Sequence, residues 1–161
     1  MESTIRSYRD SDAPGVIRLS LRAWAPVFGS VREVLGDEIF GQLYGHDWQR
    51  RQQSEVEKVL ADEKTKVWIA EADDQVIGFV AAFLRADENT GEIRMLAVEP
   101  DHQNRGLGSE LTEVAIDWIR DSGMPLAFVS TGGDIGHAPA RRTYEKVGFT
   151  PFPSMLYFRV L

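Results

Sequence analysis

The sequence predicts an α/β fold in which a mixed, mostly antiparallel central sheet is flanked by helices. Its 161 residues suit one domain, and no linker, repeat or low-complexity tract divides them. Three apolar segments with strand character follow one another between residues 66 and 98, separated by short turn-like sequences. Helical patterns precede these segments, and strand and helix patterns alternate after them. We therefore expect a single domain over residues 1–161.

The first 62 residues are predicted to form one short strand and three helices. The strand covers residues 4–8, and a helix follows that ends near Ala23. Apolar positions at helical spacing predict a second helix over 31–44, which two glycines interrupt, and a third helix over 48–62.

The rest of the chain supplies most of the sheet. Strands are expected at Lys66–Ala72, Val76–Leu84 and Glu92–Val98, joined by hairpins around 73–75 and 86–91. Then follow an amphipathic helix from Gly106 to about Arg120, a buried strand over Leu126–Thr131, a short helix over Pro139–Val147 and a final strand over 152–160.

The composition limits the chemistry and the partners. With 43% hydrophobic and 27% charged residues the chain resembles an ordinary soluble globular protein. The net charge of −7 argues against a general affinity for nucleic acid or anionic membranes. There is no cysteine, which excludes disulfides, cysteine nucleophiles and thiolate metal sites.

Two further absences shape our expectations. The three histidines lie far apart in sequence, so we expect no metal site. The first twelve residues, MESTIRSYRDSD, contain no apolar segment that could serve as a signal peptide or membrane span. We therefore expect a cytoplasmic protein.

Residues 103–109, QNRGLGS, lie where an apolar strand gives way to a helix. A helix N-terminus offers free backbone N–H groups and a partial positive charge of about half an elementary unit. Glycines there let an anion approach the backbone, and Arg105 adds a fork of donors. The segment predicts a phosphate site, although Gly106 and Gly108 would also suit a plain turn.

Two other phosphate loops do not fit this segment. A P-loop requires Lys-Ser/Thr after its last glycine, whereas Gly108 is followed by Ser109-Glu110. A dinucleotide fingerprint requires a third small residue where this chain has Leu111, and a turn directly after the strand. What remains is a pyrophosphate site at the N-terminus of a helix that follows an antiparallel strand.

Two motifs resemble the GNAT superfamily of N-acetyltransferases. Its acetyl-CoA-binding motif is similar to Gln103-x-Arg105-Gly106-x-Gly108 preceded by Leu96-Ala97-Val98-x-Pro100. Its later helix is similar to Ala140-x-x-x-Tyr144-x-x-x-Gly148-Phe149. The order of elements also agrees over residues 4–160. The chain departs from the pattern at His137, where many members carry an asparagine that reaches the pantetheine arm.

The resemblance implies where acetyl-CoA would lie. The strand ending at Val98 would be splayed from the strand over 126–131, and pantetheine would insert between them. The N–H groups of Leu96 and Val98 would pair with pantetheine and orient the thioester carbonyl. The residues expected to bind acetyl-CoA are Leu96, Ala97, Val98, Gln103, Asn104, Arg105, Gly106, Leu107, Gly108, Ser109, His137, Ala140, Arg141 and Tyr144.

Acetyl transfer to an amine needs a neutral amine, and an alkyl amine has a pKa of roughly 10.4. A carboxylate near the acceptor, acting directly or through water, can remove the proton. Glu92 resembles in position the glutamate base of histone-acetylating members, but it also fits a surface glutamate at a strand edge. Another acid or a water chain could serve instead. Arg94 would share the face of Glu92 on a regular strand, or be only a salt-bridge partner.

The leaving thiolate needs a proton donor, and the family's later helix supplies a candidate. Tyr144 carries a phenol, whose pKa of roughly 10 suits the protonation of an alkyl thiolate. At helical spacing from Ala140 and Val147, the same side chain would also suit the core. Without cysteine no acetyl-enzyme forms on sulfur, so we expect direct attack within a ternary complex.

The amine acceptor is expected to contact residues 22–65. This segment holds Trp24, Phe28, Phe40, Tyr44 and Trp48 together with Glu33, Asp37, Glu38 and Asp47. Such side chains suit a small amine, or they simply pack the helices on the sheet. The leading hypothesis is an acetyl-CoA-dependent N-acetyltransferase of a primary amine. A small molecule is preferred to a protein as the acceptor, although a peptide N-terminus or a lysine is left open, and so is a homodimer. The alternative is a non-catalytic CoA or acetyl-CoA sensor domain of the same fold.

Overall fold

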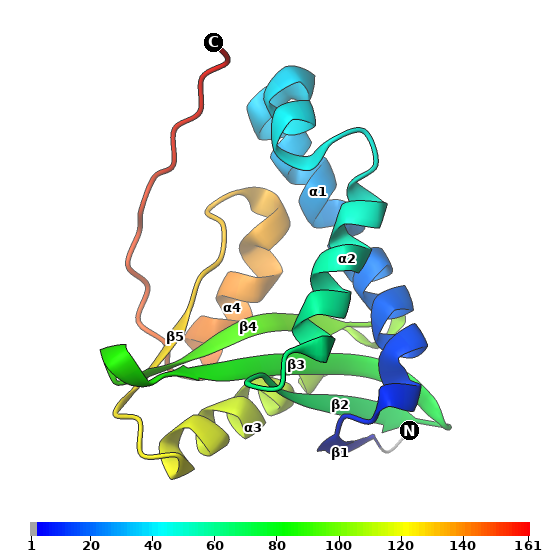
Figure 1. Cartoon of the computed structure of the whole chain (residues 1–161), viewed down its shortest axis with the longest axis vertical. Coiled ribbons are helices and arrows are strands. Elements are labelled where there is room, and N and C mark those ends of the chain that lie inside the picture. Colours follow the sequence, from blue (N-terminus) through cyan, green and yellow to red (C-terminus); the bar gives the residue numbers. More distant parts are fainter. Residues whose placement is uncertain (1–2) are drawn as a thin grey trace.

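A five-stranded sheet forms the centre of the protein, which we describe for residues 3–161 from a computed structural model (Figure 1). The strands are β1 (Thr4–Ser7), β2 (Lys66–Ala72), β3 (Gln75–Arg85), β4 (Thr90–Val98) and β5 (Leu126–Val129). They lie in the order β1-β2-β3-β4-β5, antiparallel throughout except for the parallel pair β4–β5. The predicted fold class is confirmed.

Helices cover both faces of this sheet (Figure 1). They are α1 (Ala13–Tyr44), α2 (Trp48–Ala61), α3 (Leu107–Asp121) and α4 (Ala138–Lys146). Against one face, α1 and α2 bury Val16, Leu19, Val56 and Val59 on Ile69 and Phe79. Against the other, α3 buries Leu111, Ala115 and Ile119 on Val80 and Ile93. Because β3 lies beneath helices on both sides, its centre is a continuous apolar run.

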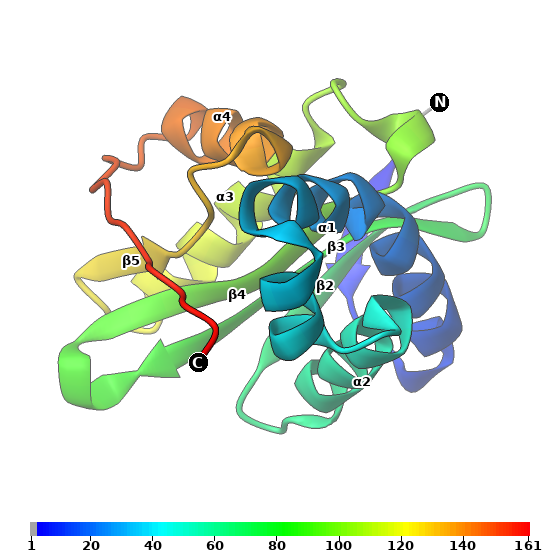
Figure 2. The same cartoon turned by 90° about the horizontal axis from the view of Figure 1, so that it is seen from above.

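Strand β4 changes its neighbours halfway along its length. Ala81 of β3 pairs with Met95 and Ala82 pairs with Ile93, so Arg94 is an extra residue and forms a β-bulge. Strand β5 pairs only with the part of β4 before this bulge, Thr90–Ile93. Beyond it the two strands separate, as Figure 2 shows from above. The sheet is therefore splayed along the second half of β4.

The predicted hairpins are confirmed, and their turns use residues that tolerate a positive φ. Asp73 and Asp74 have φ of 50° and 58° between β2 and β3. Two such residues suit a two-residue hairpin, because their twist matches that of the strands. Between β3 and β4 the chain passes through a 3-10 turn to Asn89, whose φ is 51°.

The prediction that the first helix ends near Ala23 is wrong. Helix α1 continues through Pro26 and is broken only at Gly36, where φ is 78°. A proline inside a helix removes one hydrogen bond and bends the helix, but packing of the flanking turns can carry the helix past it. A residue with a positive φ, by contrast, turns the chain away from the helix axis, and the regular helical geometry ends there.

The predicted final strand over 152–160 is also absent from the sheet. Residues 150–161 are exposed and belong to no helix or strand, and the chain runs away from α4 as an extended segment (Figure 1). Pro151 and Pro153 have no N–H group to donate to a neighbouring strand. The first half of the predicted strand therefore cannot form a regular ladder.

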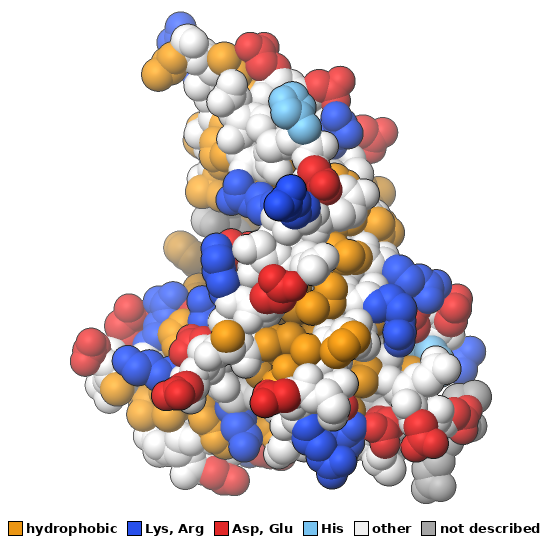
Figure 3. Space-filling model, turned by 45° about the vertical axis from the view of Figure 1, so that its right-hand side comes forward, with side chains coloured by type: hydrophobic (Ala, Val, Ile, Leu, Met, Phe, Trp, Pro, Cys, Tyr) orange, Lys and Arg blue, Asp and Glu red, His pale blue; other side chains and the backbone are white. Residues whose placement is uncertain are grey.

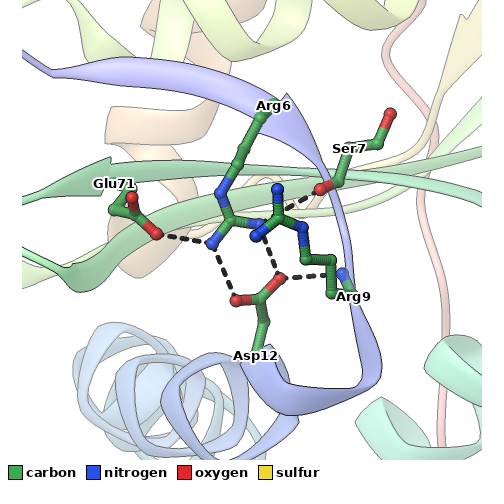
Figure 4. A network of polar contacts seen from close by, with 5 residues as sticks. All are labelled: Arg6, Ser7, Arg9, Asp12 and Glu71. Carbon is green, nitrogen blue, oxygen red and sulfur yellow. Dashed lines mark hydrogen bonds and ion pairs between the residues drawn. The ribbon is translucent and has the colours of Figure 1, made fainter.

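A network of ion pairs joins the N-terminal strand to the rest of the sheet (Figure 4). The guanidinium of Arg6 on β1 donates to both carboxylate oxygens of Asp12, at 2.8 and 2.9 Å, and to Glu71 on β2, at 2.5 Å. Asp12 also accepts the backbone N–H of Arg9. The hydrogen bonds from Arg6 lower the pKa of Asp12 below its ordinary value of 3.8, against the opposing effect of burial.

We expect Asp12→Asn to destabilise the protein by about 1–3 kcal/mol at pH 7, because it removes a charge-assisted bidentate contact. A carboxylate with a lowered pKa stabilises the fold above its unfolded pKa, and the stabilisation is lost as pH falls through the folded pKa. The difference between wild type and variant should therefore shrink below about pH 4. Chemical denaturation at several pH values measures the free energy of unfolding of both proteins.

The control for this prediction is Asp37→Asn. Asp37 pairs with Arg32, but both side chains are largely exposed, at 86% and 56%. Exposed pairs contribute little to stability. Equal effects of the two substitutions at every pH would contradict the structural role given to the Arg6–Asp12 pair.

Candidate active site

The splayed half of β4 presents unpaired backbone groups along one edge. The N–H of Glu99 donates to the carbonyl of Ile77 at 2.8 Å, so this residue faces β3. Because backbone groups alternate in direction along a strand, those of Leu96 and Val98 face the opposite edge, where β5 has already diverged. The side-chain amide of Gln103 donates to the Val98 carbonyl at 2.9 Å, on that same edge. An extended ligand could hydrogen-bond here like a further strand.

The glycine turn follows directly after this open edge. Gly106 has φ of 90° and lies immediately before α3, whose first closing bond runs from the N–H of Glu110 to the Gly106 carbonyl. The N–H groups of Leu107, Gly108 and Ser109 thus precede the intrahelical ladder, as an anion site requires. Gly108 lies close to α4, since a Cβ there would be 3.6 Å from Thr143.

A cleft of about 410 Å³ joins these features. The expected site residues that line it are Leu96, Ala97, Val98, Gln103, Asn104, Gly106, Gly108, Ser109 and Ala140. Leu107 is buried in the core, and Arg105 is exposed outside the lining. The two motifs, which are separated in sequence by the whole of α3 and β5, therefore meet on one cleft.

Three basic side chains that the sequence alone did not single out line the cleft: Arg22, Arg142 and Lys146. Arg142 and Lys146 lie four residues apart on α4, and Pro139 and Thr143 line the cleft with them. This spacing defines one helix face. The four-residue spacing of Arg142 and Lys146 could have been read from the sequence as one basic helix face. The position of Arg22, by contrast, depends on how α1 packs.

The loop between β5 and α4 is tied to α1 by a small polar cluster. Ser30 donates to Asp134 at 2.5 Å and accepts the N–H of Gly136 at 3.0 Å. His137 contacts the other oxygen of Asp134 through Nδ1. Although burial alone would raise it, these hydrogen bonds hold the pKa of Asp134 below its ordinary value. His137 itself is not among the cleft-lining residues.

The neighbouring arginines of α4 differ in role. Arg141 donates to the carbonyls of Gly132 at 2.6 Å and Asp134 at 2.7 Å, so its guanidinium holds the loop. Arg142, on the next position of the helix, faces the cleft. For contact with a bound anion, the geometry therefore favours Arg142 over the expected Arg141.

Tyr144 lies on the buried side of α4. Its ring meets Phe149 edge to face, with centroids 5.9 Å apart. Burial raises the pKa of the Tyr144 phenol to about 12. The phenol therefore stays protonated throughout the neutral range, and its side chain is not part of the cleft lining.

Glu92 lies on β4 before the bulge, where β4 and β5 are still paired. Its carboxylate forms an ion pair with Arg85, 2.6 Å away, and its side chain is only 15% exposed. Arg94 forms a separate ion pair with Asp62 at 3.0 Å. Glu92 on β4 and Tyr144 on α4, the two acid–base candidates, thus both lie outside the cleft lining.

Most of the aromatic side chains in residues 22–65 pack on one another. Phe28 stacks on Trp48 and contacts Phe40 and Tyr44 edge to face. Trp24 alone of the expected aromatic set lines the cleft, where it also contacts Phe79. The aromatic cluster therefore holds α1 and α2 together, and α1 lines the cleft with Ala23, Trp24, Pro26 and Val27.

Residues 3–161 were expected to hold no metal site and no membrane span. The described histidine, aspartate and glutamate side chains form no group of three that could hold a metal ion. None of the helices in this range combines the length and apolar character needed to cross a membrane.

Comparison with known sequences identifies related enzymes. Mycothiol acetyltransferase of Streptomyces coelicolor is 32% identical over 115 residues, which cover 67% of this chain and 37% of the relative. Mycothiol acetyltransferase of Rhodococcus opacus is 27% identical over 169 residues, covering 92% of this chain and 46% of the relative. This chain thus spans less than half the length of these curated relatives.

Comparison with solved structures supports the same fold. The aminoglycoside acetyltransferase AAC(6')-Iy, solved with the bisubstrate analogue CoA-S-monomethyl-acetylneamine, superposes with a TM-score of 0.69 at 17% identity. The superposition covers 100% of this chain and 99% of that one. The profile of the Acetyltransferase (GNAT) family matches residues 34–149, from the middle of α1 to the end of the second motif. This chain therefore belongs to the GNAT acetyltransferase family.

Proposed function

We propose that the protein transfers the acetyl group of acetyl-CoA to a primary amine of a small molecule, by direct attack within a ternary complex. The observation that carries this proposal is the open edge of β4 leading into the glycine turn of α3. Family membership supports the reaction class.

Acetyl-CoA fits the order of groups along the cleft. The N–H groups of Leu96 and Val98 would pair with the amides of pantetheine, and the first turn of α3 would hold the pyrophosphate. Arg142 and Lys146 place positive charge on the same cleft, within a protein whose net charge is −7. This local reversal of sign suits a polyanionic cosubstrate.

Two side chains are proposed for the proton transfers, Glu92 of β4 and Tyr144 of α4. We propose that Glu92 takes the amine proton through water, since its carboxylate lies outside the cleft lining. Attack of the neutral amine on the thioester carbonyl forms the new C–N bond and breaks the C–S bond, which expels the thiolate of CoA. The nitrogen, positively charged after the attack, gives up a proton to water and leaves as the neutral amide. Tyr144, whose side chain also lies outside the cleft lining, would then pass its phenolic proton to that thiolate through water, and the high pKa of Tyr144 keeps the donor form populated.

A small amine fits the acceptor side better than a polyanion or an extended basic surface. Acidic and basic side chains are interspersed on the face shown in Figure 3, without a large region of one sign. The names of the relatives point the same way, toward mycothiol and aminoglycosides. Trp24 offers one aromatic wall to such a molecule.

The deciding experiment combines calorimetry with acetyl-CoA and a thiol-release assay over amines of three kinds: aminoglycosides and amino sugars, polyamines and amino acids, and peptides. Turnover of a small amine supports the proposal. Acetylation of peptides alone would overturn the acceptor class, and tight acetyl-CoA binding without turnover of any amine would favour the sensor alternative.

Gly108→Val tests the phosphate site. The side chain would fill the space that the anion must approach, and we expect acetyl-CoA affinity to fall at least about tenfold, or about 1.4 kcal/mol. Gly106 is less suitable, because its φ of 90° strains any side chain. Isothermal titration calorimetry measures the change.

The matched control is Gly41→Val. Gly41 also lies in a helix, and a Cβ there meets no atom within 4 Å. Its affinity for acetyl-CoA should remain that of the wild type. If the folded Gly108→Val protein binds equally well, the phosphate does not lie on this turn.

Tyr144→Phe tests the proton donor while keeping the ring against Phe149. We expect kcat to fall roughly 10²-fold, the usual scale for one acid–base group, with nearly unchanged acetyl-CoA affinity. In the wild type, a pKa of about 12 should leave the phenol protonated across the neutral range. Tyr44→Phe, in the packing cluster, is the control, and wild-type kcat in Tyr144→Phe would leave that residue a core aromatic.

Glu92→Gln tests the base. The variant should lose the low-pH limb of the profile of kcat/KM against pH, in which activity rises as the base deprotonates. The activity that remains should rise only at the higher pH at which the free amine loses its own proton. Glu88→Gln is the matched control, because Glu88 pairs with the same Arg85 but is exposed. An unchanged profile in Glu92→Gln would move the base to another group or to a water chain.

A further inference from the structure

A carboxylate lies between two aromatic side chains on the sheet beside the cleft. Phe83 of β3 is the register partner of Glu92 on β4, and Glu92 is in turn the partner of Phe128 on β5. Partners on neighbouring strands point to the same face, so these side chains form one row, which we call the aromatic row. The next residues along the strands, Ile93 and Val129, pack against α3 on the opposite face. The aromatic row therefore faces the side of the sheet that carries α1 and α2.

The aromatic row lies beyond the part of the sheet that α1 and α2 cover. It belongs to the end of the β3–β4 hairpin, which projects past both helices in Figure 2. As described for residues 3–161, the core between these helices and the sheet includes neither Phe83 nor Phe128. Phe128 is 41% exposed, and Glu92 forms a floor between the rings with 15% side-chain exposure. A ligand can therefore reach the aromatic row from solvent.

A cation already lies over the aromatic row. The guanidinium of Arg85 is 5.7 Å from the centre of the Phe83 ring and 5.6 Å from that of the Phe128 ring. Both distances are within the range of cation–π attraction. The same guanidinium lies 2.6 Å from the Glu92 carboxylate. Aromatic faces with a carboxylate between them attract organic cations, and the protein fills this site with a side chain of its own.

Arg85 is held loosely in this position. Its hydrogen bonds to Glu88 are long, at 3.3 and 3.4 Å, and its side chain is 37% exposed. Although Arg85 pairs with Oε2 of Glu92, that oxygen is buried and accepts no aligned hydrogen bond within residues 3–161. Exposed ion pairs contribute little to stability, and Glu88, which is 62% exposed, can keep the guanidinium in solvent. Another cation can therefore take the place of Arg85 at low cost.

We propose that the aromatic row is the docking site for the protonated amine of the acceptor, and that Arg85 is a built-in occupant which the amine displaces. The inference rests on the proposed acetyl transfer, since it places the acceptor of that reaction. Pantetheine that runs along β4 from Val98 to Leu96, away from the glycine turn, would carry its acetyl end toward Glu92. An ammonium on the aromatic row therefore lies beside the proposed base and at the acetyl end of the cosubstrate.

The charges around the aromatic row select alkylammonium ions. Arg94 also lies over Phe83, 5.3 Å from the ring centre, but Asp62 binds and neutralises it at 3.0 Å. When Arg85 turns away, Glu92 is therefore left without a compensating charge. An alkylammonium restores that charge while its carbon chain contacts the rings, whereas an amino acid would bring a second carboxylate toward Glu92. The favoured acceptors are thus alkylamines and polyamines rather than amino acids.

The first test measures binding of propylammonium by NMR titration without acetyl-CoA. An occupant that fills a site about nine-tenths of the time lowers the apparent affinity of a ligand about tenfold. Arg85→Ala should therefore bind propylammonium about tenfold more tightly than the wild type does. The largest shifts should fall on the backbone amides of Phe83, Glu92 and Phe128. Propanol, the neutral probe of the same length, should bind neither protein.

Three variants isolate the charge and the position of the occupant. Arg85→Lys retains an internal cation and should bind propylammonium nearly as weakly as the wild type. Arg120→Ala removes an arginine that pairs with Asp117 three residues away, as Arg85 pairs with Glu88, and should leave the affinity unchanged. Adding Glu92→Gln to Arg85→Ala should abolish the tighter binding. Equal affinity in the wild type and Arg85→Ala, or tight binding that survives Glu92→Gln, overturns the proposal.

A rival role for Arg85 gives the opposite result. The guanidinium could instead recognise a carboxylate of the acceptor, and β-alanine carries a carboxylate where propylamine has a methyl group. We expect β-alanine to bind Arg85→Ala at least about tenfold more weakly than propylammonium does, because its carboxylate is repelled by Glu92. Preference of the wild type for β-alanine, lost in Arg85→Ala, establishes the rival role and overturns the proposal.

Steady-state kinetics relate the aromatic row to the reaction. Arg85→Ala should lower the KM for propylamine and leave the KM for acetyl-CoA unchanged, whereas Phe128→Leu should raise the KM for propylamine. A KM for propylamine that stays constant or rises in Arg85→Ala overturns docking at this row. Because the titrations contain no acetyl-CoA, they separate the two proposals. A protein that binds propylammonium as expected but acetylates no amine contradicts the proposed acetyl transfer and leaves the cation site standing.

Discussion

The separation of β4 from β5 after Ile93 is the constraint on which the candidate site depends. The bulge at Arg94 ends the shared ladder and leaves the next residues of β4 without a neighbour on that edge. Backbone N–H and C=O groups are rarely left without partners, because an unpaired buried group costs about as much as a lost hydrogen bond. Gln103 satisfies the Val98 carbonyl. The groups that remain open define a direction along which an extended ligand can bind.

A second set of contacts fixes the wall opposite this edge. Ser30 of α1 and the loop carbonyls bound by Arg141 hold the segment between β5 and α4 in one position. This orientation turns Arg142 and Lys146 of α4 toward the cleft. A strongly acidic protein thereby presents basic groups where the glycine turn exposes backbone N–H groups. Charge and backbone geometry reinforce each other at this point.

The sequence predicted features that depend on local patterns and missed those that depend on distant partners. Strand β2 was predicted with its observed bounds, and the two hairpins agree, because short apolar runs and the turn residues that bound them are local signals. The end of the first helix near Ala23 was predicted wrongly, since packing carries α1 onward past Pro26. Likewise the sequence located Glu92 on its strand but not its partner Arg85, which lies on β3 opposite Thr90, two positions along from the residue that faces Glu92.

The brevity of β5 links the candidate site to the outer edge of the sheet. A strand of only four residues pairs with β4 as far as Ile93 and so leaves the rest of β4 open. A longer β5 would pair with Leu96 and Val98 and close the open edge of β4. The same brevity leaves an edge with few side chains of its own for protection, and neither Leu126 nor Phe128 carries a charge. The gap that admits an extended ligand and the unprotected outer edge of the sheet therefore share one cause, the early end of β5.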